Sequence, residues 1–312
     1  MAKLVSFVII NKDRKKFLKR CLAAIFNQTY TDIEVILVDN ASTDGSVEMA
    51  RSNFPNARIV ENTINLLVAK AYNQGIAASN GEYVICINND VFLSNDYIEK
   101  TLPKFEIDSK IGSVSGKLLN PHTGRIDSAG QFLTAARQAH ERGYKQKDRN
   151  LFKEGYIWGV TGACLLCKKE MLDDIKINNE YFDEEYRAYL EDLDLNWRAY
   201  NAGWRSYFTP DAAAYHLRGS TGWRNRGRWG YLNLSDEFKF QLIKNRYATI
   251  IKNETLSGFI THIPFIFLYD MYLWIFLLFK SPWFILKFIR DISWIKKAAA
   301  KRIFIGENLR RI

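Results

Sequence analysis

Short apolar runs alternate with helix-like patterns over the first 110 residues of the chain. Runs rich in Val and Ile predict buried strands, and apolar residues spaced three and four apart predict helices. The predicted strands are Leu4–Ile10, Ile33–Val38, Arg58–Glu61 and Glu82–Ile87. The predicted helices are Lys15–Phe26, Ser46–Asn53, Val68–Ser79 and Asn95–Phe105. This alternation is typical of an α/β fold, in which a mostly parallel central sheet carries helices on both faces.

The pattern is less regular after residue 110. Three further apolar runs predict strands, Phe182–Tyr200 predicts a helix together with the segment that leads into it, and the polar stretch Arg137–Lys153 predicts a mobile loop. The three strands are Lys117–Leu119, Gly159–Leu166 and Ser206–Phe208. The composition changes near Ser257. We therefore expect one domain over residues 1–250 and a separate segment over residues 251–312.

The C-terminal segment carries two apolar patterns. Ile263–Phe279 is almost entirely apolar, but it is shorter than the roughly 20 residues of a spanning helix, and Asp270 within it would be costly in hydrocarbon. A helical stripe follows Pro282, with basic residues beside it and Trp283 and Trp294 nearby. The stripe consists of Phe284, Phe288, Ile292, Ile295, Ala299 and Ile303. This combination favours an amphipathic helix lying on a membrane surface; the alternative is a pair of core helices that pack on the domain.

Net charge and cysteine content narrow the class of protein. Of a formal net charge of +10, residues 251–312 hold ten Lys or Arg and four Asp or Glu, which favours contact of this segment with an anionic surface, either membrane or nucleic acid. Cys164 and Cys167 have the spacing of half a zinc site, but no second pair completes it, so buried free thiols are expected. Four cysteines, and a start without a signal-peptide pattern, favour a reducing, cytoplasmic setting.

Polar residues follow the predicted strands. Asn11, Asp39 and Asp90 each come just past a strand end, and ligands of α/β sheets bind at that edge, so the three should converge on one crevice. Asp90 closes the run Asn88-Asn89-Asp90, which indicates either a turn or a carboxylate that holds a divalent cation. Asp39-Asn40 is open to the same turn interpretation.

Two later motifs add candidate chemistry. In "LEDLDLNWR" (190–198), Glu191 and Asp192 suit general-base work or simply a helix N-terminus. In "HLRGSTGWR" (216–224), His216 suits a metal ligand or a structural histidine. The arginines that follow suit a clamp on phosphate or a solvated loop; they are Arg218, Arg224, Arg226 and Arg228, with Trp223 and Trp229 among them. Dinucleotide, P-loop and serine-hydrolase motifs are absent from the sequence.

In combination these motifs resemble inverting glycosyltransferases of family 2, which have the GT-A fold, and most of all the bacterial rhamnosyltransferase-type members. The resemblance runs from Ser6 to about Thr221. It rests on the stretches "SFVIINKDRKKFLKRCLAAI", "VDNASTDGS", "NNDV", "GACLLCKKEML", "FDEEYRAYLEDLDLNWRAYNAGW" and "HLRGST".

The resemblance implies roles for single positions. Asp39 would accept the pyrimidine N3–H of the nucleotide, Asp90 and His216 would hold Mn²⁺ or Mg²⁺, and Asp192 would be the catalytic base with Glu191 as runner-up. The nucleotide-sugar-binding set would be Asn11, Asp39, Asn40, Lys70, Asn88, Asn89, Trp158 and Arg218. Two positions depart from the family pattern: Asn88 stands where an aspartate is common, and Leu67 where a glycine is common.

The resemblance also implies an activity. The expected reaction transfers a sugar with inversion onto a polyprenyl-diphosphate-linked or glycan acceptor during bacterial surface-glycan synthesis. The first choice of sugar is L-rhamnose, transferred from dTDP-rhamnose. A UDP-hexose donor (glucose, galactose, galactofuranose or GlcNAc) is the alternative. The expected location is the cytoplasmic face of the membrane, bound peripherally through the C-terminal helices. A basic nucleic-acid- or membrane-binding protein without catalysis is the alternative from another class; we expect no nucleic-acid partner.

Overall fold

The structure, a computed structural model, describes residues 3–218, 235–280 and 282–308. Within these residues, ten strands form one mixed sheet with the main order β10-β12-β6-β11-β4-β1-β2-β3. β5 pairs with β12, and β7 pairs with β6, off this path. Two further strands, β8 (Gln131–Leu133) and β9 (Ala139–Glu141), pair only with each other.

The parallel half of the sheet comes from the first 90 residues. β2, β1 and β4 lie side by side in parallel register, with β3 at the outer edge, and helices connect successive strands. The elements are β1 (Val5–Asn11), α1 (Lys15–Phe26), β2 (Ile33–Asp39), α2 (Ser46–Asn53), β3 (Ala57–Glu61), α3 (Leu67–Ala77) and β4 (Tyr83–Asn88). Strands this apolar need cover on both faces, which explains the connecting helices.

The other half of the sheet is mixed. β11 runs antiparallel to both β4 and β6, while the long strand β12 runs parallel to β6. The elements are β5 (Val91–Leu93), α4 (Tyr97–Thr101), β6 (Ile111–Leu119), β7 (Ile126–Ser128), β10 (Gly155–Ile157), β11 (Cys164–Lys168), α5 (Lys169–Asp174), α6 (Glu191–Asn201) and β12 (Arg205–His216). Short 3₁₀ helices cover Leu102–Glu106 and Glu184–Tyr186.

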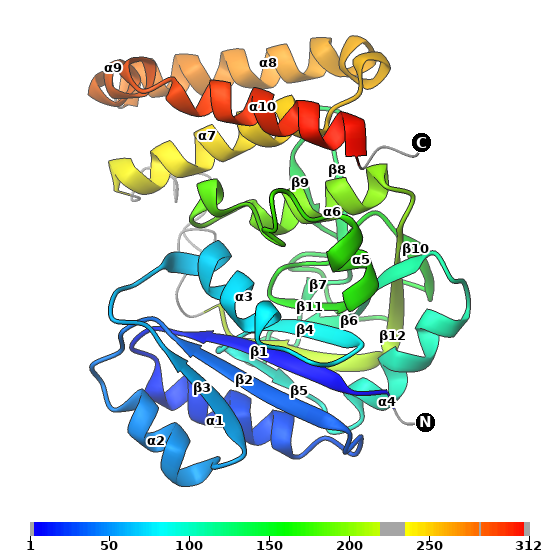
Figure 1. The fold of residues 1–312 in the computed structure, drawn as a ribbon. Coiled ribbons are helices and arrows are strands. Elements are labelled where there is room, and N and C mark those ends of the chain that lie inside the picture. The colour runs from blue at the N-terminus through cyan, green and yellow to red at the C-terminus, as the bar shows by residue number, and fades with distance from the viewer. Residues whose placement is uncertain (1–2, 219–234, 281, 309–312) are drawn as a thin grey trace.

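Helices cover both faces of the sheet, as the sequence predicts. α1 and α2 lie on one face and α3, α5 and α6 on the other (Figure 1). One buried cluster joins α1 to the sheet through residues such as Phe7, Leu22 and Ile85. A second joins α3, α5 and α6 to the opposite face through residues such as Val8 and Tyr72. All four cysteines are buried free thiols, as expected.

Three sequence predictions in the middle of the chain are wrong in detail. Asn95–Phe105 is not one helix, because Pro103 follows α4 and the chain tightens into a 3₁₀ turn. The strand predicted over Gly159–Leu166 begins only at Cys164; residues 159–163 bend toward α6 instead. The predicted loop Arg137–Lys153 contains the strand β9. The first case has a local cause, the proline, whereas in the other two long-range contacts outweigh the local pattern.

The described residues after 234 form four helices: α7 (Asp236–Asn253), α8 (Leu256–Lys280), α9 (Pro282–Arg290) and α10 (Ser293–Asn308). They form a layer on the far side of α6 from the sheet, with α8 and α9 outermost (Figure 1). α7 and α10 pack on the domain through a buried cluster that includes Tyr186, Ile243 and Trp294. The layer is therefore docked on the domain.

The predictions for this segment need two corrections. The apolar helix spans 25 residues, so it is long and apolar enough to cross a membrane, and its length does not exclude a span. The predicted single stripe is split between α9 and α10: Phe284 and Phe288 are buried, but Ile292 and Ile303 are exposed. The packing alternative holds in part, since the layer packs on the domain. Many apolar side chains of the layer stay exposed, and membrane binding remains a prediction.

Asp270 has a partner that the sequence did not suggest. Its Oδ1 lies 3.0 Å from Nε of Arg246 on α7. The carboxylate therefore faces the protein, and α8 can keep an apolar outer surface without an unpaired charge on it.

Candidate active site

Side chains at the carboxyl ends of β1, β2 and β4 join in one hydrogen-bonded chain. Asn11 donates from Nδ2 to Oδ1 of Asp39 at 3.0 Å, and its Oδ1 accepts from Nδ2 of Asn89 at 2.9 Å. The backbone N–H of Ser42 donates to the other oxygen of Asp39 at 2.7 Å. Asn11 and Asp39 are register partners and are buried. The structure thus brings these three predicted residues together at one sheet edge.

Asn40 ties this edge to α3. Its Nδ2 donates to the carbonyl oxygen of Leu67 at 3.1 Å. Leu67 has a φ of +64°, in the left-handed region that favours glycine. The glycine common in the family at this position thus has a conformational reason, and this chain keeps the conformation with a leucine. Lys70, one turn further, is half-exposed and lies 3.8 Å from Oε2 of Glu184.

Asp90 and His216 meet just beyond this edge. The imidazole Nε2 lies 3.4 Å from Oδ1 of Asp90, and both side chains are buried. They come together because β5, which starts at Val91, pairs antiparallel with the end of β12. Asn88 is held differently: its Oδ1 accepts from the hydroxyl of Tyr72 at 3.2 Å, so it packs against α3.

Asp127 is a site residue that sequence reasoning missed. Its Oδ2 lies 2.8 Å from Nδ1 of His216, and its Oδ1 accepts from Nε of Arg218. Burial disfavours the charged ring, but hydrogen bonds to Asp127 and Asp90 outweigh it and raise the pKa of His216 to about 9. Although burial opposes its charge, His216 and Arg218 hold the pKa of Asp127 below its ordinary value. "RIDSAG" carried no local signal for this role.

These residues suit a divalent cation that the substrate helps to hold. Asp90 offers a carboxylate oxygen, and His216 would offer Nε2 once a cation displaces the proton there, because its other ring nitrogen bonds Asp127. Among the described residues, no group of three His, Cys, Asp or Glu side chains is arranged to hold a metal. Two protein ligands completed by phosphate oxygens and water is a common arrangement for Mg²⁺, and an imidazole ligand also suits Mn²⁺.

Asp192 lies at the start of α6 and is held by two donors. Oδ2 accepts from the backbone N–H of Gly162 and from Nε2 of Gln131, each at 2.9 Å. A Cβ at Gly162 would lie 2.9 Å from Cβ of Asp192, so only glycine fits there without displacing the carboxylate. The neighbouring Ala163 accepts from the backbone N–H of Asn88 at 3.0 Å. Asp192 therefore reaches the sheet edge that carries Asn88.

Glu191 and Asp194 have environments unlike that of Asp192. Oε2 of Glu191 is buried and has no hydrogen-bond partner among the described residues. Burial together with the charge of Asp192 raises the pKa of Glu191 to about 8. Glu191 is therefore largely protonated at neutral pH, which weighs against a base role. Asp194 is fully buried between Arg198 (3.0 Å) and Lys252 (2.8 Å), so it anchors α6 to α7.

The remaining predicted residues lie at the margins. Trp158 packs edge to face on Trp197 of α6, with ring centroids 6.3 Å apart. Arg218 is buried, and its guanidinium lies over the ring of Tyr144, 4.7 Å from the centroid. The other basic and aromatic residues of this stretch fall within 219–234, outside the described residues; they are Trp223, Arg224, Arg226, Arg228 and Trp229.

With this geometry in place, comparison with known proteins decides the family. The family model described as "Glycosyl transferase family 2" matches residues 6–176, more than half of the chain. The chain belongs to glycosyltransferase family 2. The matched range contains the Asn11–Asp39 edge and Asp90, whereas α6, β12 and the helical layer lie beyond it.

Two relatives of this glycosyltransferase are informative. It is 27% identical over 247 residues to an N-acetylglucosaminyl-diphospho-decaprenol L-rhamnosyltransferase of Mycobacterium tuberculosis. This match covers 71% of the chain and 79% of that protein. It is 23% identical over 261 residues to a poly-beta-1,6-N-acetyl-D-glucosamine synthase of Staphylococcus epidermidis, covering 82% of the chain but only 59% of that protein.

Solved structures support the GT-A fold of the glycosyltransferase. GalNAc-T7, solved with UDP, GalNAc and Mn²⁺, superposes with a TM-score of 0.60 at 14% identity, over 80% of the chain and 48% of that protein. The mannosyltransferase PcManGT of Pyrobaculum calidifontis, solved with GDP-Man and Mn²⁺, superposes with a TM-score of 0.57 at 17% identity. This match covers 96% of the chain and 86% of that protein. At these identities the likeness concerns the fold.

Proposed function

We propose that this glycosyltransferase moves L-rhamnose from dTDP-rhamnose, with inversion, onto a polyprenyl-diphosphate-linked or glycan acceptor. One observation supports the reaction: the Asn11–Asp39 edge, the Asp90–His216 pair and the tethered carboxylate of Asp192 lie at or next to the carboxyl ends of the strands. Each has a distinct task there, namely binding the nucleotide, binding the diphosphate with its cation, and activating the acceptor. The choice of rhamnose rests on the rhamnosyltransferase relative.

The donor's base would pair with Asp39. Asn11 and the N–H of Ser42 orient this carboxylate, and each of its oxygens keeps a lone pair for the N3–H of thymine or uracil. Asp90 and His216 would hold Mn²⁺ or Mg²⁺, which as a Lewis acid stabilises the charge on the departing diphosphate. Both known structures above contain Mn²⁺, which supports a divalent cation.

Asp192 would be the general base. An acceptor hydroxyl attacks the anomeric carbon from the side opposite the diphosphate, and Asp192 takes its proton as the new bond forms. Gly162 and Gln131 keep the carboxylate in one orientation and leave it lone pairs for the acceptor. Glu191 is poorly suited to this step because it is largely protonated at neutral pH.

Replacing Asp192 by asparagine tests the base. We expect Asp192→Asn to lower transfer by about 10²- to 10⁴-fold, the usual contribution of a general base. Binding of the nucleotide sugar, measured by calorimetry, should stay near that of the wild type. Asp173→Asn, the same change at an exposed aspartate paired with Lys176, serves as the control. Near-normal turnover by Asp192→Asn would remove Asp192 from the mechanism.

A donor panel tests the sugar. Thermal shifts would be recorded with dTDP-rhamnose, UDP-glucose, UDP-galactose, UDP-galactofuranose and UDP-GlcNAc, each with and without Mn²⁺. We expect the largest shift with dTDP-rhamnose plus Mn²⁺. A larger shift with a UDP-hexose would replace rhamnose by that sugar. The synthase relative, whose product is built from N-acetyl-D-glucosamine, keeps this second candidate open.

The lipid-linked acceptor and the membrane location belong to the same proposal. The rhamnosyltransferase relative is named for a decaprenol-diphosphate-linked substrate. In this chain α8 and α9 present exposed apolar side chains such as Phe267, Phe279 and Trp283. A layer with this surface would hold the enzyme peripherally on the cytoplasmic face of the membrane, where a polyprenyl-linked acceptor is anchored. Membership of an enzyme family weighs against the nucleic-acid-binding alternative.

A further inference from the structure

The chain enters α6 through a strained segment, residues 186–190, which we name the lead-in segment. Arg187, Tyr189 and Leu190 have φ angles of +57°, +69° and +64°. Non-glycine residues held in this region cost roughly 1–3 kcal/mol each and persist where the surroundings enforce them. Three of them directly before Glu191 and Asp192 require strong external contacts.

One side chain supplies most of these contacts. Nδ2 of Asn245 lies 3.0, 2.9 and 2.7 Å from the carbonyl oxygens of Tyr186, Ala188 and Tyr189, respectively. Two N–H groups are thus shared among three acceptors, which only a primary amide or a similar donor can arrange. Asn245 is fully buried on α7. The N–H groups of its amide therefore donate to the lead-in segment.

The other two carbonyls of the lead-in segment face the two sides of the active site. The oxygen of Arg187 accepts from the backbone N–H of Val68 at 2.9 Å, in the first turn of α3. The oxygen of Leu190 accepts from the N–H of Asp194 at 3.0 Å, in the first turn of α6. The lead-in segment thus connects α3, which carries Lys70 and bonds Asn40, to α6, which carries Asp192.

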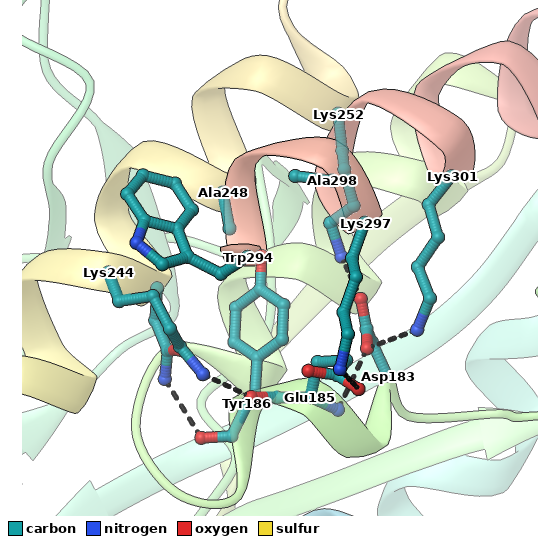
Figure 2. Close-up of a pocket in the computed structure, with 11 residues that line it drawn as sticks. Asp183, Glu185, Tyr186, Lys244, Ala248, Lys252, Trp294, Lys297, Ala298 and Lys301 are labelled. Carbon is teal, nitrogen blue, oxygen red and sulfur yellow. Dashed lines mark hydrogen bonds and ion pairs between the residues drawn. The ribbon is translucent and has the colours of Figure 1, made fainter. Parts of the chain in front are cut away.

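α7 also holds the residues just before the lead-in segment. Lys252 pairs with Asp183, and Lys244 donates to the carbonyl oxygen of Glu185. Figure 2 shows both lysines reaching down from α7, with Lys301 of α10 meeting Asp183 from the other side at 2.6 Å. The chain before the segment is thereby anchored, so Asn245 acts on a short stretch with fixed ends.

We propose that Asn245 is a positioning residue: its amide fixes the lead-in segment and thereby places Asp192 against the acceptor. The inference rests on the proposed function only in taking Asp192 as the base. Asn245 lies outside the range matched by the family model, on a helix whose packing alone suggests a structural part.

Asn245→Asp tests the proposal, because a buried carboxyl has the same shape but has at most one donor hydrogen for the three carbonyl oxygens. Amide hydrogen exchange over residues 186–193 should accelerate about tenfold or more, as expected when a buried hydrogen-bond donor is lost. The kcat for transfer should fall about tenfold to a hundredfold while the KM for the nucleotide sugar is unchanged, because displacement of a catalytic group costs rate rather than donor affinity.

Asn201→Asp is the matched control. Asn201 donates from Nδ2 to the carbonyl oxygen of Asn253 at 2.8 Å, so it is a buried amide between α6 and α7 that does not touch the lead-in segment. We expect this variant to keep the wild-type rates of amide exchange over residues 186–193 and the wild-type kcat. Only its free energy of unfolding should fall. Should Asn245→Asp not fold, Asn245→Ser removes the amide without adding charge and is read by the same measurements.

Unchanged exchange over residues 186–193 in the Asn245 variant, or equal acceleration in the Asn201 control, would overturn the positioning role. A fall in kcat shared equally by both variants would do the same. The exchange measurement needs no substrate. It therefore separates a failure of this inference from a failure of the proposed rhamnosyl transfer, which would show as absent turnover in the wild-type enzyme.

Discussion

At the scale of single residues, Glu191 and Asp192 show how environment separates two adjacent carboxyls. Besides its two donors at Oδ2, the N–H groups of Gly162 and Gln131, Asp192 accepts from the backbone N–H of Leu193 at Oδ1. Within the part of the chain that the structure describes, Oε2 of Glu191 is buried without a hydrogen-bond partner, so burial favours its neutral form. On a helix the two also point about 100° apart. The two adjacent carboxyls therefore have different surroundings, and Asp192 remains our candidate for the base.

The raised pKa of Glu191 predicts a pH dependence of stability. Its folded value of about 8 lies above the ordinary 4.5, so the folded protein binds the proton more tightly than the unfolded chain. The free energy of unfolding should therefore fall as pH rises from about 4.5 to about 8 and then level off. Glu191→Gln removes this loss and should be more stable than the wild type above pH 8, by on the order of 1–3 kcal/mol.

Urea unfolding of both proteins between pH 5 and 9 checks this prediction. Transfer at pH 7 should also persist in Glu191→Gln, because the amide stands in for a protonated carboxyl. Parallel pH profiles for the two proteins would mean that Glu191 is ionised in the folded state.

At the scale of elements, the two helices that flank the site begin in the same unusual way. α3 starts at Leu67 and α6 is preceded by Leu190, both with φ of +64°. Each turn frees a backbone carbonyl for a specific partner: Leu67 for Asn40, and Leu190 for the first turn of its own helix. Local propensity opposes both turns, so tertiary contacts must hold them.

Two substitutions at Leu67 isolate the cost of this turn. Leu67→Gly and Leu67→Ala both remove the side chain, but only glycine adopts positive φ freely. We expect the glycine variant to exceed the alanine variant in free energy of unfolding by about 1 kcal/mol. Chemical denaturation of the pair provides the measurement, and equal stabilities would indicate that α3 does not begin with a left-handed residue in solution.

At the scale of the whole molecule, the helical layer has two surfaces with different tasks. Its inner helices, α7 and α10, bury charged pairs such as Lys252–Asp183 against the domain. Its outer helices, α8 and α9, expose side chains such as Phe267 and Trp283. An apolar surface of this kind is costly in water and is typical of membrane contact. We therefore predict that the outer surface, rather than net charge alone, drives vesicle binding.

Three residues on one side of α8 test this surface. Ile260, Phe267 and Leu278 are 56–66% exposed, and their spacing places them along one face of the helix. Replacing all three by glutamate should lower binding to vesicles of anionic phospholipid by about tenfold or more. Each replacement removes an apolar side chain that would be buried in the lipid interface. Co-sedimentation measures the change.

The control for this prediction carries the same change in charge. Ile64, Ile107 and Leu151 are exposed apolar residues of the domain, outside the helical layer. Their replacement by glutamate should lower vesicle binding less than the triple replacement on α8 does. If both triple variants lose binding equally, the attraction is electrostatic and the outer surface of α8 is not its basis.

The sequence by itself determined the α/β class, most strands and helices of the first 90 residues, and the polar residues that follow the strands. These features depend on periodic burial and on turn chemistry, which are local properties. The ordered motifs also indicated the family before any geometry was known. Expectations failed where Pro103 and the bend before Cys164 interrupt the local pattern.

Only the tertiary structure decided how the site is held. Asp127 bonds His216 across 89 residues, Gln131 bonds Asp192 across 61, and Asn245 bonds the lead-in segment across more than 55. It also decided that burial raises the pKa of Glu191 and that Asp270 of the apolar helix α8 pairs inward with Arg246. Such contacts depend on which distant segments meet when the sheet and the helical layer assemble. No periodicity along the chain encodes them, because each requires only one suitable side chain at each end.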